Sequence, residues 1–392
     1  MPVPVPAGCC RRNARRPPFC IEGSFVLCKS CDRKPSYMYP SMDKDFIGVF
    51  HETRNRKYSC ESPEVFMEER ETSISMTPVD KLNYEMMELY SILSPKEEEV
   101  CIRKHLLKKM VGLLEGSIGD ATVSPFGSYE YGLFLPTSDF DIVICPKTAM
   151  GDSNTVLKGV RSIISKADFI SAESIIHLSK AKIPILRCAD EAFGYRFDIS
   201  VGHANGLSQA RYIKKTLSER PYMRPFVLLL KHFLRIRDIS ESKRGGLCSY
   251  AQFLMMLHFF QLHPLVQTRC IDPYENMGVL FLDFFQYYGF NMHGNAKLTI
   301  QTPGYRKKDD SSLIFSIEDP VDRAHDAGSL CANGHAIMDV FNHAYRIMSM
   351  VFHKKIPDSK SLSSLWMRSS KAEELWRERN IQRWRDMYCA GS

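Results

Sequence analysis

Two aspartates separated by one residue lie in a short apolar segment and could bind divalent cations together. Asp139 and Asp141 alternate with Phe140 and Ile142. Because side chains alternate between the two faces of a strand, both carboxylates would project from one face while the apolar residues pack on the other. Carboxylate oxygens are ligands that magnesium prefers, usually together with substrate phosphates. The spacing therefore predicts a site that binds phosphate groups through Mg²⁺ or Mn²⁺.

A third aspartate has the same surroundings in a second segment. Asp198 and Ser200 alternate with Phe197 and Ile199. Three converging carboxylates repel one another, and divalent cations remove that repulsion. We therefore predict that Asp198 completes a set of carboxylates that would hold two divalent metal ions. The alternative at this point is a solvated surface strand whose acids bind nothing.

A glycine–serine pair precedes the first aspartate at a spacing of ten residues. Gly127 lacks a side chain, so its backbone can approach a triphosphate closely. The hydroxyl of Ser128 can donate a hydrogen bond to a phosphate oxygen. The pair therefore predicts a turn that holds the phosphates beside the carboxylates.

Hydrophobic periodicity predicts the elements that must position these residues. Residues 122–146 and 182–201 have the alternation of strands, whereas residues 207–262 are mainly helical with long apolar stretches. Another helix is expected near residues 335–352. The expected fold class is α+β, in which a small mixed sheet with flanking helices carries the aspartates and a mostly helical domain faces it.

The length of 392 residues allows two domains of ordinary size with additional tails. We expect a disordered basic leader over residues 1–78, a domain that carries the aspartates over 116–210, a helical central domain formed by 80–115 and 211–370, and a charged C-terminal tail over 371–392. The substrate would then lie in the cleft between the two domains, where ligands often bind.

The net charge of +7 is concentrated near the N-terminus. Residues 1–60 contain 11 Lys and Arg against 5 Asp and Glu, whereas the remainder contains 41 against 40. The body is therefore not a strongly basic nucleic-acid binder, and contact with RNA must come from local patches or from a partner. The thirteen scattered cysteines favour reduced thiols in the cytosol or nucleus. No apolar run is long enough to span a bilayer, and no secretory signal is expected.

The leader carries two features with weak functional signals. The arginine cluster over residues 11–16 could be a nuclear address or an arm that contacts RNA, with a solvated tail as an equal alternative. Cys28 and Cys31 form a CxxC pair, but a zinc site needs four ligands at regular spacing. The neighbouring cysteines and histidine are irregularly spaced, so the pair alone does not predict zinc.

Several longer segments resemble known families. The glycine–serine turn with its two aspartates resembles the polymerase β nucleotidyltransferase superfamily. Further segments resemble terminal RNA nucleotidyltransferases, and within them the nuclear noncanonical poly(A) polymerases of the TRAMP exosome-cofactor type, over about residues 80–370. These segments are FDISVGHANG (197–206), RPFVLLLKHFLRIRD (224–238), GGLCSYAQFLMMLHFFQLHP (245–264) and SIEDP (316–320).

The resemblance implies roles for individual residues. It implies that the three aspartates bind the catalytic metal ions, and that Gly127 and Ser128 hold the triphosphate. The resemblance also implies two basic phosphate contacts, Lys231 and Arg235, followed by a phosphate-binding serine and a base-stacking tyrosine, Ser249 and Tyr250. The last implied nucleotide contacts lie within and just after SIEDP and are Asp319, Asp322 and His325. The spacing of four residues between Lys231 and Arg235 independently places both on one helix face.

One position departs from the resembled subgroup. TRAMP-type enzymes have Asn-Asp-Val-Gly-Arg where this chain has His-Asp-Ala-Gly-Ser over residues 325–329. Terminal uridylyltransferases resemble this chain in having a histidine at the position of His325, and they tend to have an acid at that of Asp322. A histidine can crowd a purine and donate to O4 of uracil, whereas adenine presents an amino donor there. Gln209, near the place of a sugar-binding asparagine, also leaves ribose recognition open.

The resemblance as a whole implies template-independent addition of nucleotides to RNA 3′ ends, with AMP favoured, in RNA processing, surveillance or decay. The alternative is a terminal uridylyltransferase that selects UTP through His325. The implied partners are an RNA 3′ end, ATP or UTP, a zinc-knuckle RNA-binding protein and an exosome-linked helicase, with no membrane. We expect a nuclear protein, with the cytoplasm as the alternative.

Two functions of other classes remain open. A catalytically silent scaffold could keep the fold and bind RNA-decay partners, although the presence of all three aspartates argues against it. A primer-independent oligoadenylate or cyclic-dinucleotide synthase would share the first motif.

Overall fold

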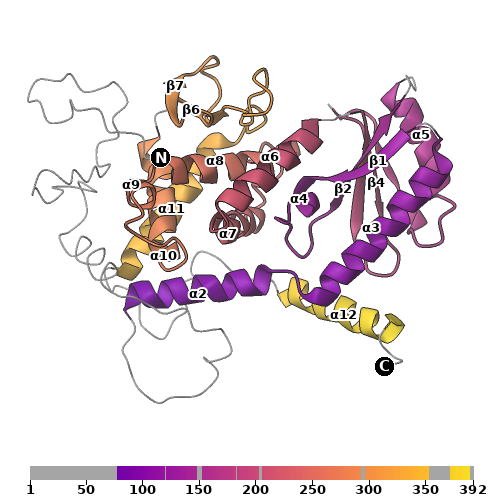
Figure 1. The fold of residues 1–392 in the computed structure, drawn as a ribbon, viewed down its shortest axis with the longest axis horizontal. Coiled ribbons are helices and arrows are strands. Elements are labelled where there is room, and N and C mark those ends of the chain that lie inside the picture. The colour runs from indigo at the N-terminus through magenta and orange to yellow at the C-terminus, as the bar shows by residue number, and fades with distance from the viewer. Residues whose placement is uncertain are drawn as a thin grey trace, which may run out of the picture.

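The computed structural model describes residues 77–119, 121–147, 152–181, 183–202, 205–292, 296–352 and 371–388. The arginine cluster and the CxxC pair of the leader lie outside these ranges. The described chain forms two lobes (Figure 1). We call residues 97–202 the sheet lobe, and residues 78–93 with 205–352 the helical lobe.

The sheet lobe is built on a mixed five-stranded sheet with strand order β1-β2-β5-β4-β3. Strands β2 and β5 pair in parallel, and the other neighbours pair antiparallel. The strands are β1 (Ala121–Phe126), β2 (Phe140–Pro146), β3 (Ile176–Leu178), β4 (Ile185–Ala189) and β5 (Arg196–Val201). This mixed sheet confirms the expected α+β class, and strands form within both predicted ranges.

Helices α3 (Glu97–Ser117) and α5 (Ser153–Ile164) pack against this sheet. Ile102, Leu106 and Met110 form one stripe of α3 and are fully or almost fully buried in the hydrophobic cluster of the strands. The predicted helical domain included residues 80–115, but α3 contributes its buried face to the sheet lobe. Only α2 (Pro78–Leu93) places its apolar stripe in the core of the helical lobe.

The helical lobe is built around three strongly apolar helices. These are α7 (Met223–Arg235), α8 (Ser249–Leu262) and α10 (Met277–Gln286), whose buried residues form one continuous core. Around them lie α6 (Asn205–Glu219), α9 (Pro264–Gln267), a π-helix (Tyr287–Asn291) and α11 (Gly334–Phe352), which confirms the helix expected near residues 335–352. None of the helices in the described ranges is both long and apolar enough to cross a bilayer.

The helical lobe also contains a three-stranded sheet that the sequence reading did not predict. Its strand order is β7-β6-β8, with β6 (Ala296–Thr299), β7 (Gly304–Lys307) and β8 (Ser316–Ile317). Strand β8 has two residues and pairs in parallel with β6. It holds the start of the SIEDP segment in place, so this sheet positions the residues that follow it.

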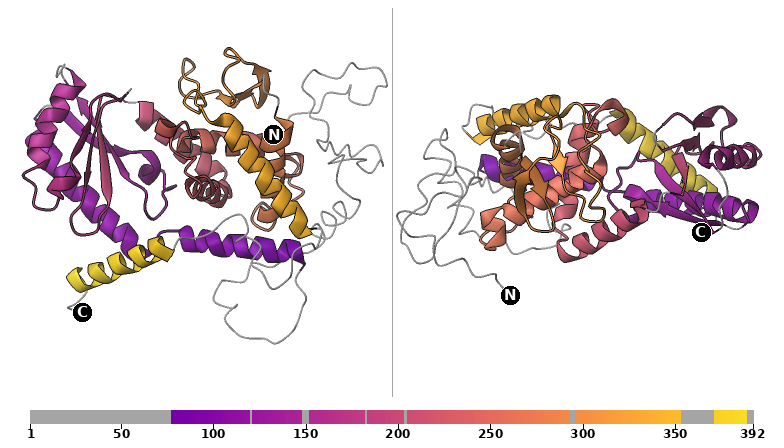
Figure 2. Two further views of the ribbon diagram at one scale, coloured as in Figure 1. Left: turned by 180° about the vertical axis from the view of Figure 1, so that it is seen from behind. Right: turned by 90° about the horizontal axis from the view of Figure 1, so that it is seen from above.

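The expected charged tail contains an ordered helix, α12 (Lys371–Tyr388), that lies along α3 and its junction with α2 (Figures 1 and 2). Trp376 of α12 packs edge-on against Tyr195 beside β5, with ring centroids 4.9 Å apart. The segment is highly charged, but its buried Arg377 and Ile381 face the body of the protein. The C-terminal segment is therefore part of the fold around the sheet lobe.

Candidate active site

The three predicted aspartates gather at one end of strands β2 and β5. Asp141 and Asp198 are direct partners in the parallel register of these strands. The intervening side chains Phe140, Ile142 and Ile199 are almost completely buried on the other face. Asp139 lies immediately before β2, so alternation places its carboxylate on the same face as the other two.

The predicted glycine–serine turn contacts this cluster directly. Gly127 follows β1 and begins the short helix α4 (Gly127–Glu130), with a φ of 67°. A Cβ atom at this position would lie 2.0 Å from Oδ2 of Asp141, so only glycine fits. Ser128 is buried as the next residue of α4. The turn and the carboxylates therefore form one continuous surface.

Burial makes the ionised forms of these carboxylates unfavourable. Burial, and then repulsion from Asp198, raises the pKa of Asp141 to about 7. Burial also raises the pKa of Asp139, although Arg196 opposes the rise. Lys231 of α7 provides positive charge nearby, since attraction to Asp141 partly offsets the burial that lowers the pKa of this lysine to about 8. Such a cluster is stabilised by cations.

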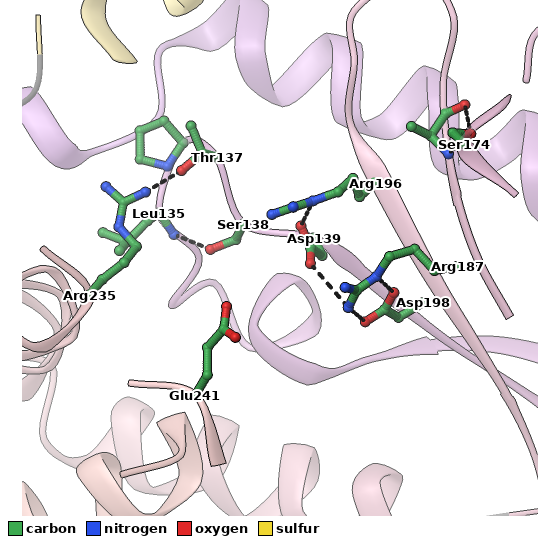
Figure 3. A network of polar contacts seen from close by, with 12 residues as sticks. Leu135, Thr137, Ser138, Asp139, Ser174, Arg187, Arg196, Asp198, Arg235 and Glu241 are labelled. Carbon is green, nitrogen blue, oxygen red and sulfur yellow. Dashed lines mark hydrogen bonds and ion pairs between the residues drawn. The ribbon is translucent and has the colours of Figure 1, made fainter. Parts of the chain in front are cut away.

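Two arginines provide the counter-charge in this structure (Figure 3). Arg187 of β4 donates two hydrogen bonds to Asp198, from Nε at 2.7 Å and from Nη2 at 2.5 Å. Arg196 donates to Oδ1 of Asp139 at 2.9 Å. The sequence reading missed both arginines, although each lies in the strand segments around the third aspartate.

The donor set fits a divalent metal ion by its chemistry. No group of three Asp, Glu, His or Cys side chains in the described ranges is arranged as a ready metal site. However, Nη2 of Arg187 lies 2.5 Å from Asp198 and 4.0 Å from Asp139, so one cationic group already faces two of the aspartates. The carboxylates of Asp139, Asp141 and Asp198 would supply the oxygen ligands that such an ion prefers.

A buried arginine that the sequence reading also missed supports the approach to Asp139. Arg103 of α3 has no exposed surface, and its Nη2 donates to the carbonyls of Pro136 and Ser138 at 2.7 Å each. Its guanidinium also lies 4.9 Å from the ring centre of Phe140. Position 103 lies next to the apolar stripe of α3, where a solvated side chain is not expected. A charged residue there could have indicated a buried arginine.

A second group of predicted residues converges on Asp319, which is 1% exposed. Its Oδ1 accepts from the Tyr250 hydroxyl at 2.7 Å, and its Oδ2 accepts from Gln209 at 3.1 Å. Nδ1 of His325 lies 2.9 Å from the same Oδ2. Burial raises the pKa of Asp319, but these partners outweigh burial and leave its pKa below the usual range. The ionised carboxylate thus orients Tyr250, Gln209 and His325.

The remaining predicted contacts lie around this second group. Ser249 begins α8 immediately before Tyr250. The backbone N–H of Asp322 donates to Asp319 at 3.3 Å. A cavity of about 260 Å³ adjoins Asp319 and His325.

Tyr131 is a further residue close to the carboxylates, and it was not among the predicted site residues. Burial raises its pKa, and the neighbouring Asp141 and Cys248 add to the rise. Its hydroxyl therefore lies within electrostatic range of the carboxylate cluster and of the residue that precedes α8.

Arg235 is placed differently from the other predicted phosphate contact on α7. Its Nη1 donates to the hydroxyl of Thr137 (Figure 3). Its Nη2 lies 2.5 Å from Glu373 of α12. Lys231 instead donates to the carbonyl of Leu133 at 3.1 Å, within range of Asp141. The structure therefore brings Lys231 to the carboxylates, while Arg235 joins the helical lobe to the loop before Asp139 and to α12.

The sequence matches a family model described as the central palm domain of mitochondrial-like poly(A) RNA polymerases over residues 82–216. This range contains all three aspartates and the glycine–serine turn.

The chain is also similar to curated proteins. It is 28% identical over 317 residues to the poly(A) RNA polymerase CID14 of Cryptococcus neoformans, covering 78% of this chain and 41% of that protein. It is 26% identical over 293 residues to an inactive poly(A) RNA polymerase protein of Drosophila melanogaster, Trf4-2, covering 71% of this chain and 70% of that protein. The chain thus spans less than half the length of the Cryptococcus relative.

Solved structures share the fold. The polymerase core of TRAMP, described as an RNA surveillance complex, superposes with a TM-score of 0.65 at 25% identity, covering 78% of this chain and 95% of that chain. The Cid1 poly(U) polymerase superposes with a TM-score of 0.60 at 22% identity, covering 74% and 99%. The second likeness shows the fold alone.

Proposed function

We propose that this chain, which belongs to the polymerase β-type terminal nucleotidyltransferases related to TRAMP-type poly(A) polymerases, adds nucleotides to RNA 3′ ends without a template, with AMP favoured. The observation that carries the proposal is the direct pairing of Asp141 with Asp198 across parallel strands, beside Asp139 and the turn at Gly127. Isolated surface acids would not need this arrangement, because clustering buried like charges is costly.

In the proposed reaction, the RNA 3′-oxygen forms a bond to the α-phosphorus of a nucleoside triphosphate, and the bond from that phosphorus to the β-phosphate oxygen breaks. Pyrophosphate leaves, and the hydroxyl proton passes to water. Asp139, Asp141 and Asp198 would hold Mg²⁺ or Mn²⁺, which supplies charge stabilisation for the reacting phosphate and the attacking oxygen. Lys231 adds positive charge at the same end of the sheet.

The nucleotide choice depends on the proton positions of His325. Asp319 is ionised and can only accept, so Nδ1 of His325 must donate to it. In the neutral ring, Nε2 is then an acceptor, which matches the amino group of adenine. When the ring is protonated, Nε2 becomes a donor and matches O4 of uracil instead. The Nδ1 contact therefore leaves both nucleotides open at this position: the neutral ring suits adenylation, and the protonated ring, which the hydrogen bond to Asp319 favours, suits uridylylation, the second candidate function.

An RNA extension assay tests the proposal. Purified protein, Mg²⁺ and an end-labelled RNA oligomer are incubated with each of the four nucleotides separately, and one reaction omits RNA. We expect extension with ATP and little product without RNA. UTP as the preferred substrate would select the second candidate, and products formed without RNA would indicate a primer-independent synthase. No extension with any nucleotide would favour a silent protein like the Drosophila relative.

Partners and compartment belong to the same proposal. The nearly balanced charge outside residues 1–60 supports weak RNA binding by the body alone. A zinc-knuckle RNA-binding protein and an exosome-linked helicase would complete a nuclear surveillance assembly, in keeping with the RNA surveillance complex that contains the TRAMP core. Stimulation of extension by such an RNA-binding subunit at moderate salt is the expected result.

A further inference from the structure

Arg187 occupies the middle of the carboxylate cluster rather than its edge. It lies opposite Asp198 in the antiparallel register of β4 and β5. Its side chain is 21% exposed and that of Asp198 is 16% exposed, so solvent screens their attraction only partly. Its Nη2 also faces Asp139 at 4.0 Å, while Arg196 holds the other oxygen of Asp139 from the outside (Figure 3).

This pairing uses both oxygens of Asp198. The two hydrogen bonds, at 2.7 Å and 2.5 Å, form the bidentate arrangement that is strongest between arginine and a carboxylate. Arginine stays protonated at any pH that the protein survives, so the bond is not released by deprotonation. A divalent ion held by Asp198 needs one of these oxygens at about 2.0–2.1 Å. Each oxygen keeps a second lone pair, but the guanidinium repels a second cation on the same carboxylate, so metal binding at Asp198 favours breaking these two bonds.

We propose that Arg187 is an internal counter-ion that occupies the cation position of the metal-free site and is displaced when a divalent ion binds. The proposal rests on the proposed function for the identity of the metal ligands. Arg187 then acts in two opposite ways. It stabilises the carboxylate cluster when no metal is bound, and it weakens the apparent affinity for the first ion because the ion must break its bonds.

A partner for the displaced guanidinium lies on the helical lobe. Glu241, in the segment between α7 and α8, faces the cluster from the side opposite β4 (Figure 3). It is close enough to add to the raised pKa of Arg187, after the dominant hydrogen bond to Asp198. Glu241 is 47% exposed and pairs with Lys243 at 3.0 Å, so its carboxylate can exchange partners. Metal binding would then increase the attraction between the two lobes.

Mn²⁺ binding tests this proposal without nucleotide or RNA. Free Mn²⁺ is measured by electron paramagnetic resonance during titration of the full chain and of Arg187→Gln. We expect the variant to bind Mn²⁺ about tenfold more tightly, because its carboxylates have lost their competitor, and to unfold at a lower temperature in the absence of metal. Equal or weaker Mn²⁺ binding by the variant, or no binding by either protein, would overturn the proposal.

Three further variants make the result specific. Arg187→Lys keeps the charge but loses the bidentate geometry, so intermediate affinity is expected, and it provides the test if the glutamine variant does not fold. Arg196→Gln removes an exposed contact to one oxygen of Asp139, so a smaller change is expected. Glu241→Gln should weaken Mn²⁺ binding when Arg187 is present and not when it is replaced. A gain from Arg196→Gln as large as that from Arg187→Gln would refute the central position of Arg187.

The two proposals can fail separately. RNA extension by the wild-type chain without tighter Mn²⁺ binding by Arg187→Gln would overturn the role of Arg187 and leave the proposed function intact. Tighter Mn²⁺ binding without RNA extension would support the role of Arg187 and overturn the polymerase.

Discussion

At the scale of single residues, Asp141 and Asp198 contribute to stability in opposite directions although they are strand partners. Burial and repulsion from Asp198 disfavour the charged form of Asp141, as its raised pKa of about 7 indicates. Asp198, in contrast, receives two short hydrogen bonds from Arg187. Their proposed roles in binding metal are alike, but their contributions to the stability of the fold without metal are therefore different.

We predict opposite stability effects for the two asparagine variants without divalent ions. Asp141→Asn should leave the free energy of unfolding unchanged or raise it, because it removes an unfavourable buried charge. Asp198→Asn should lower it by about 1–3 kcal/mol, because Arg187 loses its charged partner. Urea unfolding in chelator measures both. Equal losses for the two variants would contradict this assignment.

His325 is the residue whose protonation state we propose to influence the choice of nucleotide. The hydrogen bond to Asp319 raises its pKa most, burial opposes the rise, and Asp322 and Asp326 add to it. The ring therefore titrates at or above the ordinary histidine pKa of about 6.5. Below its pKa the ring is protonated and Nε2 donates, whereas above it Nε2 accepts.

The preference for UTP over ATP should therefore be greatest at low pH and fall as pH rises through the pKa of His325. The measurement is the ratio of kcat/KM for UTP to that for ATP between about pH 6 and 8.5, and other titrations that affect both nucleotides cancel in this ratio. His325→Asn should give a ratio that is flat with pH and favours ATP. A pH-dependent ratio that survives this substitution would remove His325 as the selector.

The sequence predicts part of this site at the residue level. Alternation alone indicates which side of each strand carries Asp139, Asp141 and Asp198. It does not reveal Arg187, because the pairing of Arg187 with Asp198 depends on the register of two strands separated by a loop. It also does not reveal that Arg235 binds Glu373, since 138 positions separate the two residues.

At the scale of elements, the turn between β1 and α4 depends on one glycine. Gly127 has a left-handed backbone, and any side chain there would overlap Asp141. Gly116, near the end of α3, has nothing within 4 Å of an added Cβ. Substitution of Gly116 by alanine is therefore a control for the same substitution at Gly127.

Gly127→Ala should abolish RNA extension and destabilise the protein by at least about 1–2 kcal/mol, which is the cost of the left-handed backbone alone. Gly116→Ala should stabilise it by about 0.5–1 kcal/mol, because alanine favours a helix. Chemical denaturation and extension rates are the measurements. Normal activity of Gly127→Ala would show that the close approach to Asp141 is not needed.

Helix α12 joins the C-terminus to the connection between α2 and α3. Arg377 is almost buried and donates to both oxygens of Glu99, at 2.8 Å and 2.7 Å, as well as to the carbonyl of Ser94 at 3.0 Å. Arg385 of the same helix pairs with Glu98, but its side chain is 54% exposed. The sequence did not predict this packing because α12 is highly charged and lacks a clear apolar stripe.

Arg377→Ala should lower the free energy of unfolding by about 3–5 kcal/mol, because Glu99 would remain buried without its partner. Arg385→Ala should change it by less than about 1 kcal/mol, as is usual for exposed ion pairs. Both are measured by urea denaturation. Similar small effects for the two variants would indicate that α12 does not stabilise the fold through Glu99.

At the scale of the whole molecule, the sequence predicts an α+β protein with two lobes because strand and helix periods occupy separate stretches. The boundary between the two lobes is less predictable from the sequence, because α3 follows α2 along the chain but buries its apolar stripe against the strands. The small sheet β7-β6-β8 was missed because β8 has only two residues, too few for a detectable alternation. It nevertheless positions Asp319.

The central claim is that the three aspartates perform nucleotidyl transfer, and similarity alone does not settle it because an inactive relative is 26% identical to this chain. The most direct measurement compares RNA extension rates with ATP and Mg²⁺ for the wild-type chain, the asparagine variants of the three aspartates, and Asp168→Asn, which changes an exposed acid of the same lobe. We predict losses of at least about a hundredfold for Asp139→Asn, Asp141→Asn and Asp198→Asn, and no loss for Asp168→Asn. Wild-type extension that persists in the three variants, or no extension by the wild-type chain, would contradict the claim.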